Sequence, residues 1–240
     1  MNNNYCKTAK KILTQRINTF FKDKPTNSIA VVGISGGKDS TITAKLLVDT
    51  LGVDRVLGVL MPNGKGKQDS DAYKVVEYLG IKWKEIDISP MYNEFVKSFS
   101  DCTEPMLQNL APRLRMTTLY AIAQNSKVPA FVVNTCNMSE TFVGYATKWG
   151  DNVGDFEVLG DMLVTDILKL GDYLGVPYEL VHKTPSDGLC GKSDEENLGV
   201  TYESIDNYIN GRMELLTEKE KERIKHLHEA NKHKKFSMEI

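Results

Sequence analysis

The 240-residue sequence predicts an α/β protein with a doubly wound, mostly parallel sheet and helices on both of its faces. Short β-branched runs alternate with longer amphipathic segments, which is the pattern of successive strand–helix–strand units. Gly-rich and turn-rich clusters separate these runs. Crossovers between parallel strands are right-handed, so the connecting helices cover the sheet. The sequence contains no internal repeat or convincing linker, and a single domain over residues 1–240 is expected.

The composition is that of an ordinary soluble globular protein, with 41% hydrophobic and 26% charged residues. The net charge of −2 gives no general attraction to nucleic acid or to an anionic membrane, so neither partner is expected. No run of about eighteen apolar residues exists, and the N-terminal residues lack the apolar core of a secretion signal. The four cysteines are widely spaced and form no Cys-x-x-Cys pair, which favours reduced thiols in a cytoplasmic protein.

The first third of the chain shows the alternation most clearly. Residues 5–23 place apolar side chains at helical intervals. The run 27–34 lies between turn residues and a Gly pair, as a buried strand does. Residues 39–52 predict a helix that ends at Gly52, because glycine is common just after the last helical turn. Residues 55–61 predict a second buried strand.

The middle and end of the chain continue the pattern less regularly. In chain order the expected elements are a helix (69–80), a strand (82–88), a helix (89–99), a helix (109–127), a strand (129–135) and two closing helices (202–212 and 217–235). Pro112 is expected early in its helix, where a missing N–H costs little. The turn-rich segments 145–160 and 183–199 are typical of functional lids.

Three loops are expected to meet at one edge of the sheet. They follow Ile34, Met61 and Thr135, each at the end of a predicted strand. Doubly wound sheets bind their ligands at the carboxyl ends of the strands. The sequence therefore predicts one composite site there.

The loop GISGGKDST, residues 33–41, carries the clearest chemistry at that edge. It fits neither the Walker pattern nor the dinucleotide fingerprint. Its glycines and the following helix N-terminus offer backbone N–H groups to an anion, and its serines add hydroxyl donors. Asp39 beside a bound phosphate requires a cation between them, which points to Mg²⁺. The alternative is a tight Gly-Gly turn without a ligand.

The motif Ser-Gly-Gly-Lys-Asp-Ser resembles the pyrophosphate loop of the ATP pyrophosphatases, which split ATP between its α and β phosphates. Four later blocks resemble the NAD synthetase family within that superfamily. They are NLAPRLRM (109–116), NTCNMSETFVGYATKWGD (134–151), SDEENLGVTYESIDNYI (193–209) and NKHKK (231–235). Together with the loop they cover roughly residues 28–235. The resemblance implies a Rossmann-like adenine nucleotide hydrolase fold.

The resemblance implies the ammonia-dependent form of this ligase, because the chain has no room for an amidohydrolase domain. The implied reaction converts deamido-NAD, ATP and ammonia into NAD, AMP and pyrophosphate through a nicotinate acyl-adenylate. The resemblance also implies a homodimer, since the family builds its deamido-NAD site between subunits. The alternatives are another ATP pyrophosphatase, such as a tRNA-sulfurising enzyme, and a non-catalytic ATP-binding module. No Cys pair or basic tract supports the tRNA enzyme.

Site residues carry over by matching position. The positions matching ATP contacts are Gly33, Ser35, Gly36, Gly37, Lys38, Asp39, Ser40, Thr135 and Ser186. Those matching Mg²⁺ ligands are Asp39 and Glu140, and those matching deamido-NAD contacts are Arg113, Lys148, Asp155, His233 and Lys234. Asp39, Glu140 and Asp155 are the candidate catalytic groups, with Asp155 orienting or deprotonating ammonium. Without the resemblance, Glu140 and the basic residues could be solvated charges of ordinary helices and loops.

Two positions depart from the family pattern. Many ammonia-dependent members have Arg where this chain has Leu60 and a phosphate-binding Lys where it has Val164. We hypothesise that Lys38, with Lys65 or Lys67 of the following loop, replaces part of this positive charge. The alternative for Lys38 is a side chain that points to solvent.

Overall fold

The computed structural model describes residues 3–64, 70–183 and 193–234. Its strands form one sheet in the order β3-β2-β1-β4-β5, and every neighbouring pair is parallel. The strands are β1 (Ile29–Gly33), β2 (Val56–Leu60), β3 (Lys82–Glu85), β4 (Ala130–Asn134) and β5 (Phe156–Glu157). The predicted fold class is confirmed. The strand order reverses between β1 and β4, which is where such sheets bind ligands.

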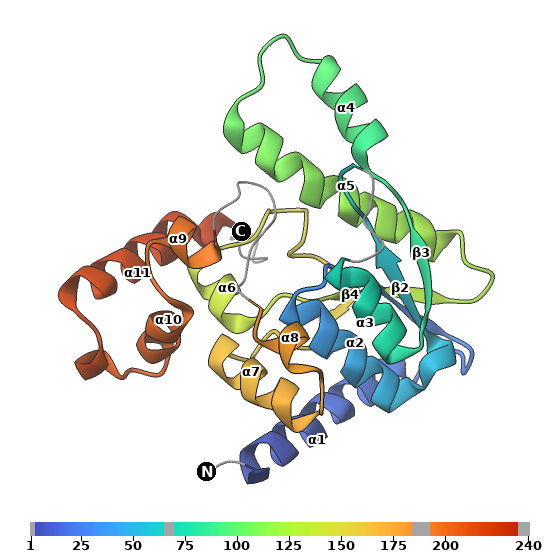
Figure 1. Ribbon diagram of the computed structural model, residues 1–240, viewed down its shortest axis with the longest axis horizontal. Coiled ribbons are helices and arrows are strands. Elements are labelled where there is room, and N and C mark those ends of the chain that lie inside the picture. The colour runs from blue at the N-terminus through green and yellow to red at the C-terminus, as the bar shows by residue number, and fades with distance from the viewer. Residues whose placement is uncertain (1–2, 65–69, 184–192, 235–240) are drawn as a thin grey trace.

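Helices connect and surround the strands (Figure 1). The α-helices are α1 (Asn3–Phe21), α2 (Lys38–Leu51), α3 (Asp71–Leu79), α4 (Ser89–Lys97), α5 (Glu104–Gln124), α6 (Met138–Val143), α7 (Val164–Tyr173), α8 (Tyr178–Val181), α9 (Asp194–Leu198), α10 (Tyr202–Ile209) and α11 (Glu218–Ala230). Short 3₁₀ turns are η1 (Val53–Arg55), η2 (Met213–Leu215) and η3 (Lys232–Lys234). None of the helices within the described ranges is long and apolar enough to cross a membrane.

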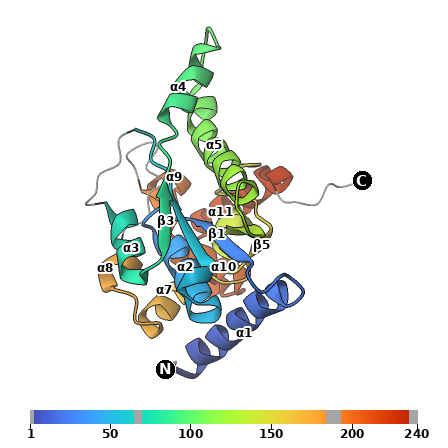
Figure 2. The ribbon, with the colours of Figure 1, turned by 90° about the vertical axis from the view of Figure 1, so that its right-hand side faces the viewer.

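The two faces of the sheet have separate apolar layers. Along β1 successive side chains point to opposite faces, so Ala30 and Val32 join one buried cluster and Val31 joins the other. The larger cluster lies under α1, α2, α3 and α7, and the smaller one lies under α5. Figure 2 shows α5 on one side of the sheet and α2, α3 and α7 on the other.

The helix α5 differs from its prediction. It begins at Glu104 rather than Asn109, so Pro112 lies inside the helix and not near its start. Pro105 occupies the favourable position in the first turn, after Thr103 in an extended conformation. Pro112 instead removes one backbone hydrogen bond in mid-helix. With α4, the first half of α5 forms an arm that projects from the sheet (Figures 1 and 2).

The last third of the chain has more regular structure than its sequence suggested. The turn-rich segment 145–160 contributes the two-residue strand β5, and α7 follows it. The helices α6, α10 and α11 share a separate apolar cluster with α9 beyond the β4 side of the sheet. The final helix ends at Ala230, so His233 and Lys234 lie in the turn η3 rather than in that helix.

Candidate active site

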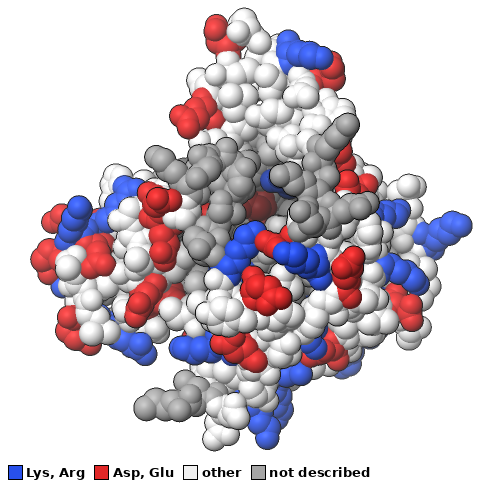
Figure 3. Space-filling view, viewed as in Figure 1, with Lys and Arg blue, Asp and Glu red and all other residues white. Residues whose placement is uncertain are grey.

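A pocket of about 820 Å³ opens at the carboxyl edge of the sheet. Ile34, Met61 and Thr135 all line it, which confirms that the three loops share one edge. The face seen in Figure 3 is hollowed near its centre, and acidic atoms are visible inside the hollow. The pocket therefore lies at the point where the strand order reverses.

Position 36, in the loop after β1, requires a glycine. Gly36 has a φ of +81°, a left-handed conformation that side chains disfavour. A Cβ on Gly36 would lie 2.7 Å from the backbone N of Ala72 and 2.8 Å from the Cβ of Asp71, at the start of α3. Glycine here lets the loop turn tightly against α3, which leaves Gly33, Ser35 and Gly37 facing the pocket.

Hydrogen bonds within the loop hold its hydroxyl groups in place. The Oγ atoms of Ser35 and Ser40 lie 3.0 Å apart, and the Gly37 N–H donates to Ser35 Oγ at 3.2 Å. Ser40 Oγ donates to the carbonyl of Gly37 at 3.1 Å. Gly37 is the N-cap of α2 and has no side-chain cap. The first turn of α2 therefore keeps backbone donors for an anion.

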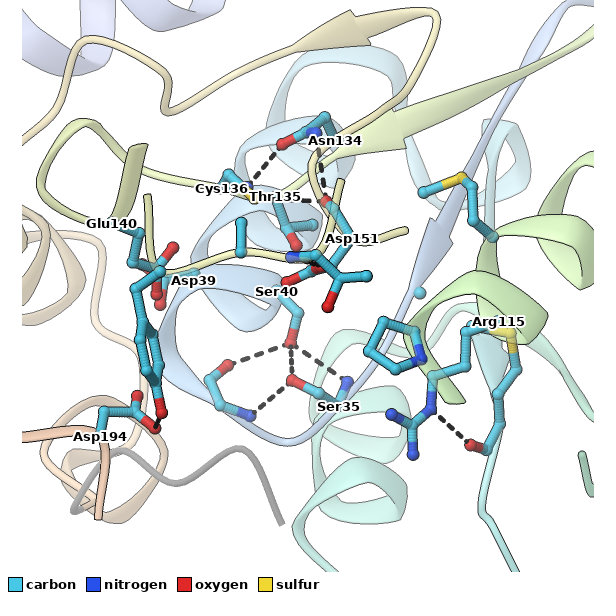
Figure 4. A pocket seen from close by; sticks show the side chains of 18 of the residues that line it. Ser35, Asp39, Ser40, Arg115, Asn134, Thr135, Cys136, Glu140, Asp151 and Asp194 are labelled. Carbon is cyan, nitrogen blue, oxygen red and sulfur yellow. Dashed lines mark hydrogen bonds between the residues drawn. The ribbon is translucent and has the colours of Figure 1, made fainter. Parts of the chain in front are cut away.

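The metal-ligand candidates come from two elements on opposite sides of the strand-order reversal. Asp39 lies in the first turn of α2, and Glu140 lies in the first turn of α6. Asn137 joins them: its Nδ2 donates to Asp39 Oδ1 at 3.1 Å, and its Oδ1 accepts the Glu140 N–H at 2.9 Å. Figure 4 shows Asp39 and Glu140 side by side, with Arg115 on the other side of the pocket.

The electrostatics of this pair favour a cation. Burial, followed by the charge of Asp39, raises the pKa of Glu140 to about 8. Burial lowers the pKa of the Lys38 ammonium, but the carboxylates of Asp39 and Glu140 outweigh burial and raise it. The raised pKa shows that a second negative charge beside Asp39 is disfavoured unless a cation offsets it, and Lys38 Nζ pairs with Asp39 Oδ2 at 2.8 Å.

Asp39 and Glu140 fit a Mg²⁺ ion whose other coordination positions are filled by a bound phosphate ligand and water. Mg²⁺ usually takes one or two carboxylates, substrate phosphates and waters. Within the described ranges no group of three or more His, Cys, Asp or Glu side chains could hold a metal by itself. The pair of Asp39 and Glu140 lies next to the glycine loop, and a phosphate held there would complete the coordination.

The predicted residues fall into three groups. Those that line the pocket are Gly33, Ser35, Gly37, Lys38, Asp39, Ser40, Thr135, Glu140 and Lys234. Those that do not line it are Gly36, Arg113, Lys148, Asp155 and His233. Three of these are linked by hydrogen bonds: Arg113 Nε donates to the Lys148 carbonyl at 3.2 Å, and Lys148 Nζ donates to the His233 carbonyl at 2.7 Å. Ser186, Lys65 and Lys67 lie outside the described residues.

Asp155 has partners that explain why it is outside the pocket. Its Oδ2 accepts the backbone N–H of Val132 at 2.7 Å, and its Oδ1 accepts the Tyr120 hydroxyl at 3.4 Å. Both partners lie on elements of the α5 face. The carboxylate therefore fixes the chain between β4 and β5.

Several charged residues of the pocket were missed by the sequence interpretation, among them Asp151 and Arg115. Asp151 lines the pocket, and burial raises the pKa of its carboxyl group. Arg115 also lines it, and its Nε donates to the Met61 carbonyl at 3.1 Å. Both belong to blocks that resemble NAD synthetase, but in these blocks the resemblance pointed to Lys148 and Arg113 as the binding residues. The sequence signals that could have identified them are the Asp of the KWGD motif, which is Asp151, and the second Arg of PRLR, which is Arg115.

The loop that carries Lys148 and Asp151 is strained at one residue. Trp149 has a φ of +63°, and it is the sole non-glycine residue with a positive φ in the described part of the chain. The Trp149 N–H donates to Asn152 Oδ1 at 3.1 Å, and Asn152 Nδ2 donates to the Lys234 carbonyl at 3.2 Å. The 146–155 loop is therefore fastened to the turn after α11.

The fold and site define an α/β nucleotide-binding protein. Its glycine loop and carboxylate pair occupy the position in which this architecture binds phosphate. A family model described as NAD synthase matches residues 8–238. The NH(3)-dependent NAD(+) synthetase of Methanococcus aeolicus is 38% identical over 225 residues, which cover 88% of this chain and 85% of that protein. The chain belongs to the NAD synthetase family and is thus an ATP-dependent amide-forming ligase.

Solved structures share the fold of this chain. An NMN synthetase from Francisella tularensis has a TM-score of 0.87 and 32% identity, with 99% of each chain covered. The NH3-dependent NAD synthetase of Campylobacter jejuni has a TM-score of 0.81 and 24% identity, with 100% of this chain and 99% of that chain covered. The second likeness is one of fold.

Proposed function

We propose that this chain, an NAD synthetase by family, acts as one catalytic domain over residues 1–240 in the cytoplasm. It converts deamido-NAD, ATP and ammonia into NAD, AMP and pyrophosphate. The observation that carries this proposal is the placement of the loop and the carboxylate pair in one pocket. The loop offers donors to phosphates, and Asp39 and Glu140 offer the hard oxygen ligands that accompany ATP chemistry.

Amide formation proceeds in two steps. An oxygen of the nicotinate carboxylate attacks the α-phosphorus of ATP, and the bond from that phosphorus to the bridging oxygen breaks. Pyrophosphate leaves with the bonding electron pair. The N–H donors after Gly33 and the serine hydroxyls stabilise the charge that develops on it. Mg²⁺ held by Asp39 and Glu140 would add to this charge stabilisation when bound.

Ammonia completes the reaction. Its lone pair attacks the acyl carbon of the adenylate, AMP departs with the electrons of the acyl–oxygen bond, and nitrogen loses a proton. Asp151 is better placed than Asp155 to orient ammonium, because Asp151 lines the pocket and Asp155 is engaged with Val132 and Tyr120. A carboxylate attracts ammonium and accepts its proton. We therefore reassign this role to Asp151.

A second acceptor is supported by one comparison. The Francisella protein that covers 99% of this chain at 32% identity is an NMN synthetase by its description. The same chemistry on nicotinate mononucleotide, which lacks the adenylyl half of deamido-NAD, would give NMN. The reacting carboxylate is the same in both acceptors, so the loop, the carboxylate pair and Asp151 would serve either one.

We also propose a homodimer formed through the arm of α4 and α5. Met91, Phe95 and Phe99 recur at four-residue intervals and are 42%, 46% and 47% exposed. The described chain buries no side chain of α4. An apolar stripe of this kind is typical of an interface, and a second copy would offer an identical stripe.

One assay tests the function and chooses the acceptor. Purified protein is incubated with ATP, Mg²⁺, ammonium and either deamido-NAD or nicotinate mononucleotide, and the amide product and AMP are quantified. We expect equal amounts of NAD and AMP, no amide when ammonium is omitted, and a higher kcat/KM for deamido-NAD. A higher kcat/KM for the mononucleotide would make the second function the correct one. No amide from either acceptor would refute both.

A further inference from the structure

Lys38 is a buried cation beside the glycine loop. It is the first residue of α2, and its side chain is 5% exposed. Its Nζ lies 2.8 Å from Asp39 Oδ2 and 5.4 Å from the ring centroid of Tyr202. The expectation that Lys38 could point to solvent is therefore wrong. The side chain therefore holds a positive charge inside the pocket, beside the loop, where an anionic ligand can reach it.

The segment SDEENLGVTY, residues 193–202, lies next to the Lys38 ammonium through the ring of Tyr202. The Tyr202 hydroxyl lies 3.5 Å from Asp194 Oδ2, and the Tyr145 hydroxyl donates to Asp194 Oδ1 at 3.3 Å. The backbone N–H of Tyr202 donates to Glu195 Oε1 at 2.8 Å. Asp194 is 7% exposed and Tyr202 is 3% exposed. These hydrogen bonds hold the Tyr202 ring in place, and a cation near the face of an aromatic ring is attracted to it.

The two positions at which the family resemblance implies a cation hold buried apolar side chains here. Leu60 ends β2 and is 2% exposed. Val164 begins α7 and is 4% exposed, and its backbone N–H donates to Ser139 Oγ at 3.0 Å. Neither side chain can neutralise a phosphate. Any side-chain positive charge at the loop therefore comes from other residues of the pocket.

The other cations that line the pocket, among the residues described, have different partners. Arg115 Nε donates to the Met61 carbonyl, on the side of the pocket away from Asp39. Lys183 Nζ pairs with Asp71 at 2.5 Å. Lys234 Nζ donates to the Gly144 carbonyl at 2.8 Å. Lys38 is the one among these four that lies on the loop itself.

We propose that Lys38 binds the pyrophosphate end of ATP, and that Tyr202 and Asp194 position its ammonium. This inference rests on the proposed function, because it assumes that the loop holds pyrophosphate. It gives the SDEENLG block a role in ordering the anion site. Tyr202 and Asp194 act through Lys38 and are positioning residues.

The test is the affinity for inorganic pyrophosphate in the presence of Mg²⁺, measured by calorimetry. Lys38→Met keeps the length of the side chain and removes its charge. We expect its pyrophosphate Kd to rise about tenfold to a hundredfold, as for loss of a charged hydrogen bond. The affinity for AMP should stay the same. An unchanged pyrophosphate Kd in folded Lys38→Met protein would overturn the proposal.

Two further variants separate this role from a structural one. Lys45→Met removes a lysine of the same helix that pairs with Asp49 outside the pocket, and it should leave pyrophosphate binding unchanged. Tyr202→Leu should weaken pyrophosphate binding in the same direction as Lys38→Met, whereas Tyr202→Phe, which keeps the ring and loses only the hydroxyl contact with Asp194, should weaken it less. Equal pyrophosphate affinity for the Leu and Phe variants would contradict positioning by the ring.

The inference and the proposed function can fail separately. If the wild-type protein forms NAD but Lys38→Met binds pyrophosphate as tightly as wild type, the role of Lys38 is wrong and the function stands. If the wild-type protein forms no amide but binds pyrophosphate more tightly than Lys38→Met, the reaction is wrong and the role of Lys38 stands.

Discussion

The pocket at the carboxyl edge of the sheet and the arm of α4 and α5 differ in the side chains that each one buries. The pocket encloses charged groups, with Lys38 5% exposed and Asp194 7% exposed. The arm leaves apolar side chains such as Phe95 and Phe99 about half exposed. Both arrangements cost stability in an isolated chain. This difference supports the two proposals that the pocket binds a charged ligand and that the arm binds a second copy of the chain.

The largest effect is expected from the pocket carboxylates. Asp39→Asn keeps the shape of the side chain and removes the charge that would hold Mg²⁺ near phosphate. We expect kcat/KM for ATP to fall by about 10²–10³-fold, as for other losses of transition-state charge stabilisation. Steady-state kinetics at saturating ammonium measure this. Asp49→Asn, on the same helix but paired with Lys10 and Lys45 at the surface, is the matched control and should retain full activity.

The glycine loop should be the next most sensitive feature. Gly36→Ala forces a side chain into a φ of +81° and against the backbone of Ala72 at 2.7 Å. We expect a loss of about 2–4 kcal/mol in unfolding free energy, from the strained conformation and the clash together. Gly80→Ala has a similar φ of +62° and no neighbour within 4 Å, so it should cost about 1 kcal/mol. Equal losses in urea unfolding would show that Ala72 does not constrain the loop.

A smaller, selective effect is expected at Asp151. Asp151→Asn removes a carboxylate that lines the pocket but leaves the loop and the metal candidates intact. We expect the KM for ammonium to rise about tenfold, with the KM for ATP little changed. Asp155→Asn is the comparison variant, since Asp155 does not line the pocket. A larger rise in the ammonium KM for Asp155→Asn would restore the original assignment of this role.

The arm should affect assembly more than the fold of one chain. Phe95→Glu places a charge in the apolar stripe and should weaken the proposed dimer by about 2 kcal/mol or more, roughly thirtyfold in Kd. Sedimentation velocity over a concentration series measures this. Leu215→Glu alters a side chain that is 61% exposed in η2, away from the arm, and should leave the dimer intact. A wild-type protein that is monomeric at all concentrations would refute the interface.

The sequence was most informative where a local pattern determines the structure. The strands β1, β2 and β4 were predictable because each is a continuous apolar run, buried on both faces. The strand β5 is two residues long, and its place depends on pairing with Val133 and Asn134 of β4. No local pattern could have indicated it.

The same limit applies to the candidate site. The glycine loop was recognisable because its conformation requires glycine. The sequence could not show whether Arg113 or Arg115 enters the pocket. Residues two apart on a helix point in nearly opposite directions, so only one of the two side chains can face the pocket. Which one enters the pocket depends on how α5 packs on the sheet. The burial of Lys38 likewise depends on α9 and α10, which begin more than 150 residues later in the chain.

Isotope transfer tests the acyl-adenylate mechanism most directly. Deamido-NAD labelled with ¹⁸O in its nicotinate carboxylate is converted with ATP, Mg²⁺ and ammonium, and the AMP and pyrophosphate are analysed by mass spectrometry. The proposed attack on the α-phosphorus predicts one ¹⁸O in each AMP and none in pyrophosphate. Unlabelled AMP, or label in pyrophosphate, would contradict the mechanism.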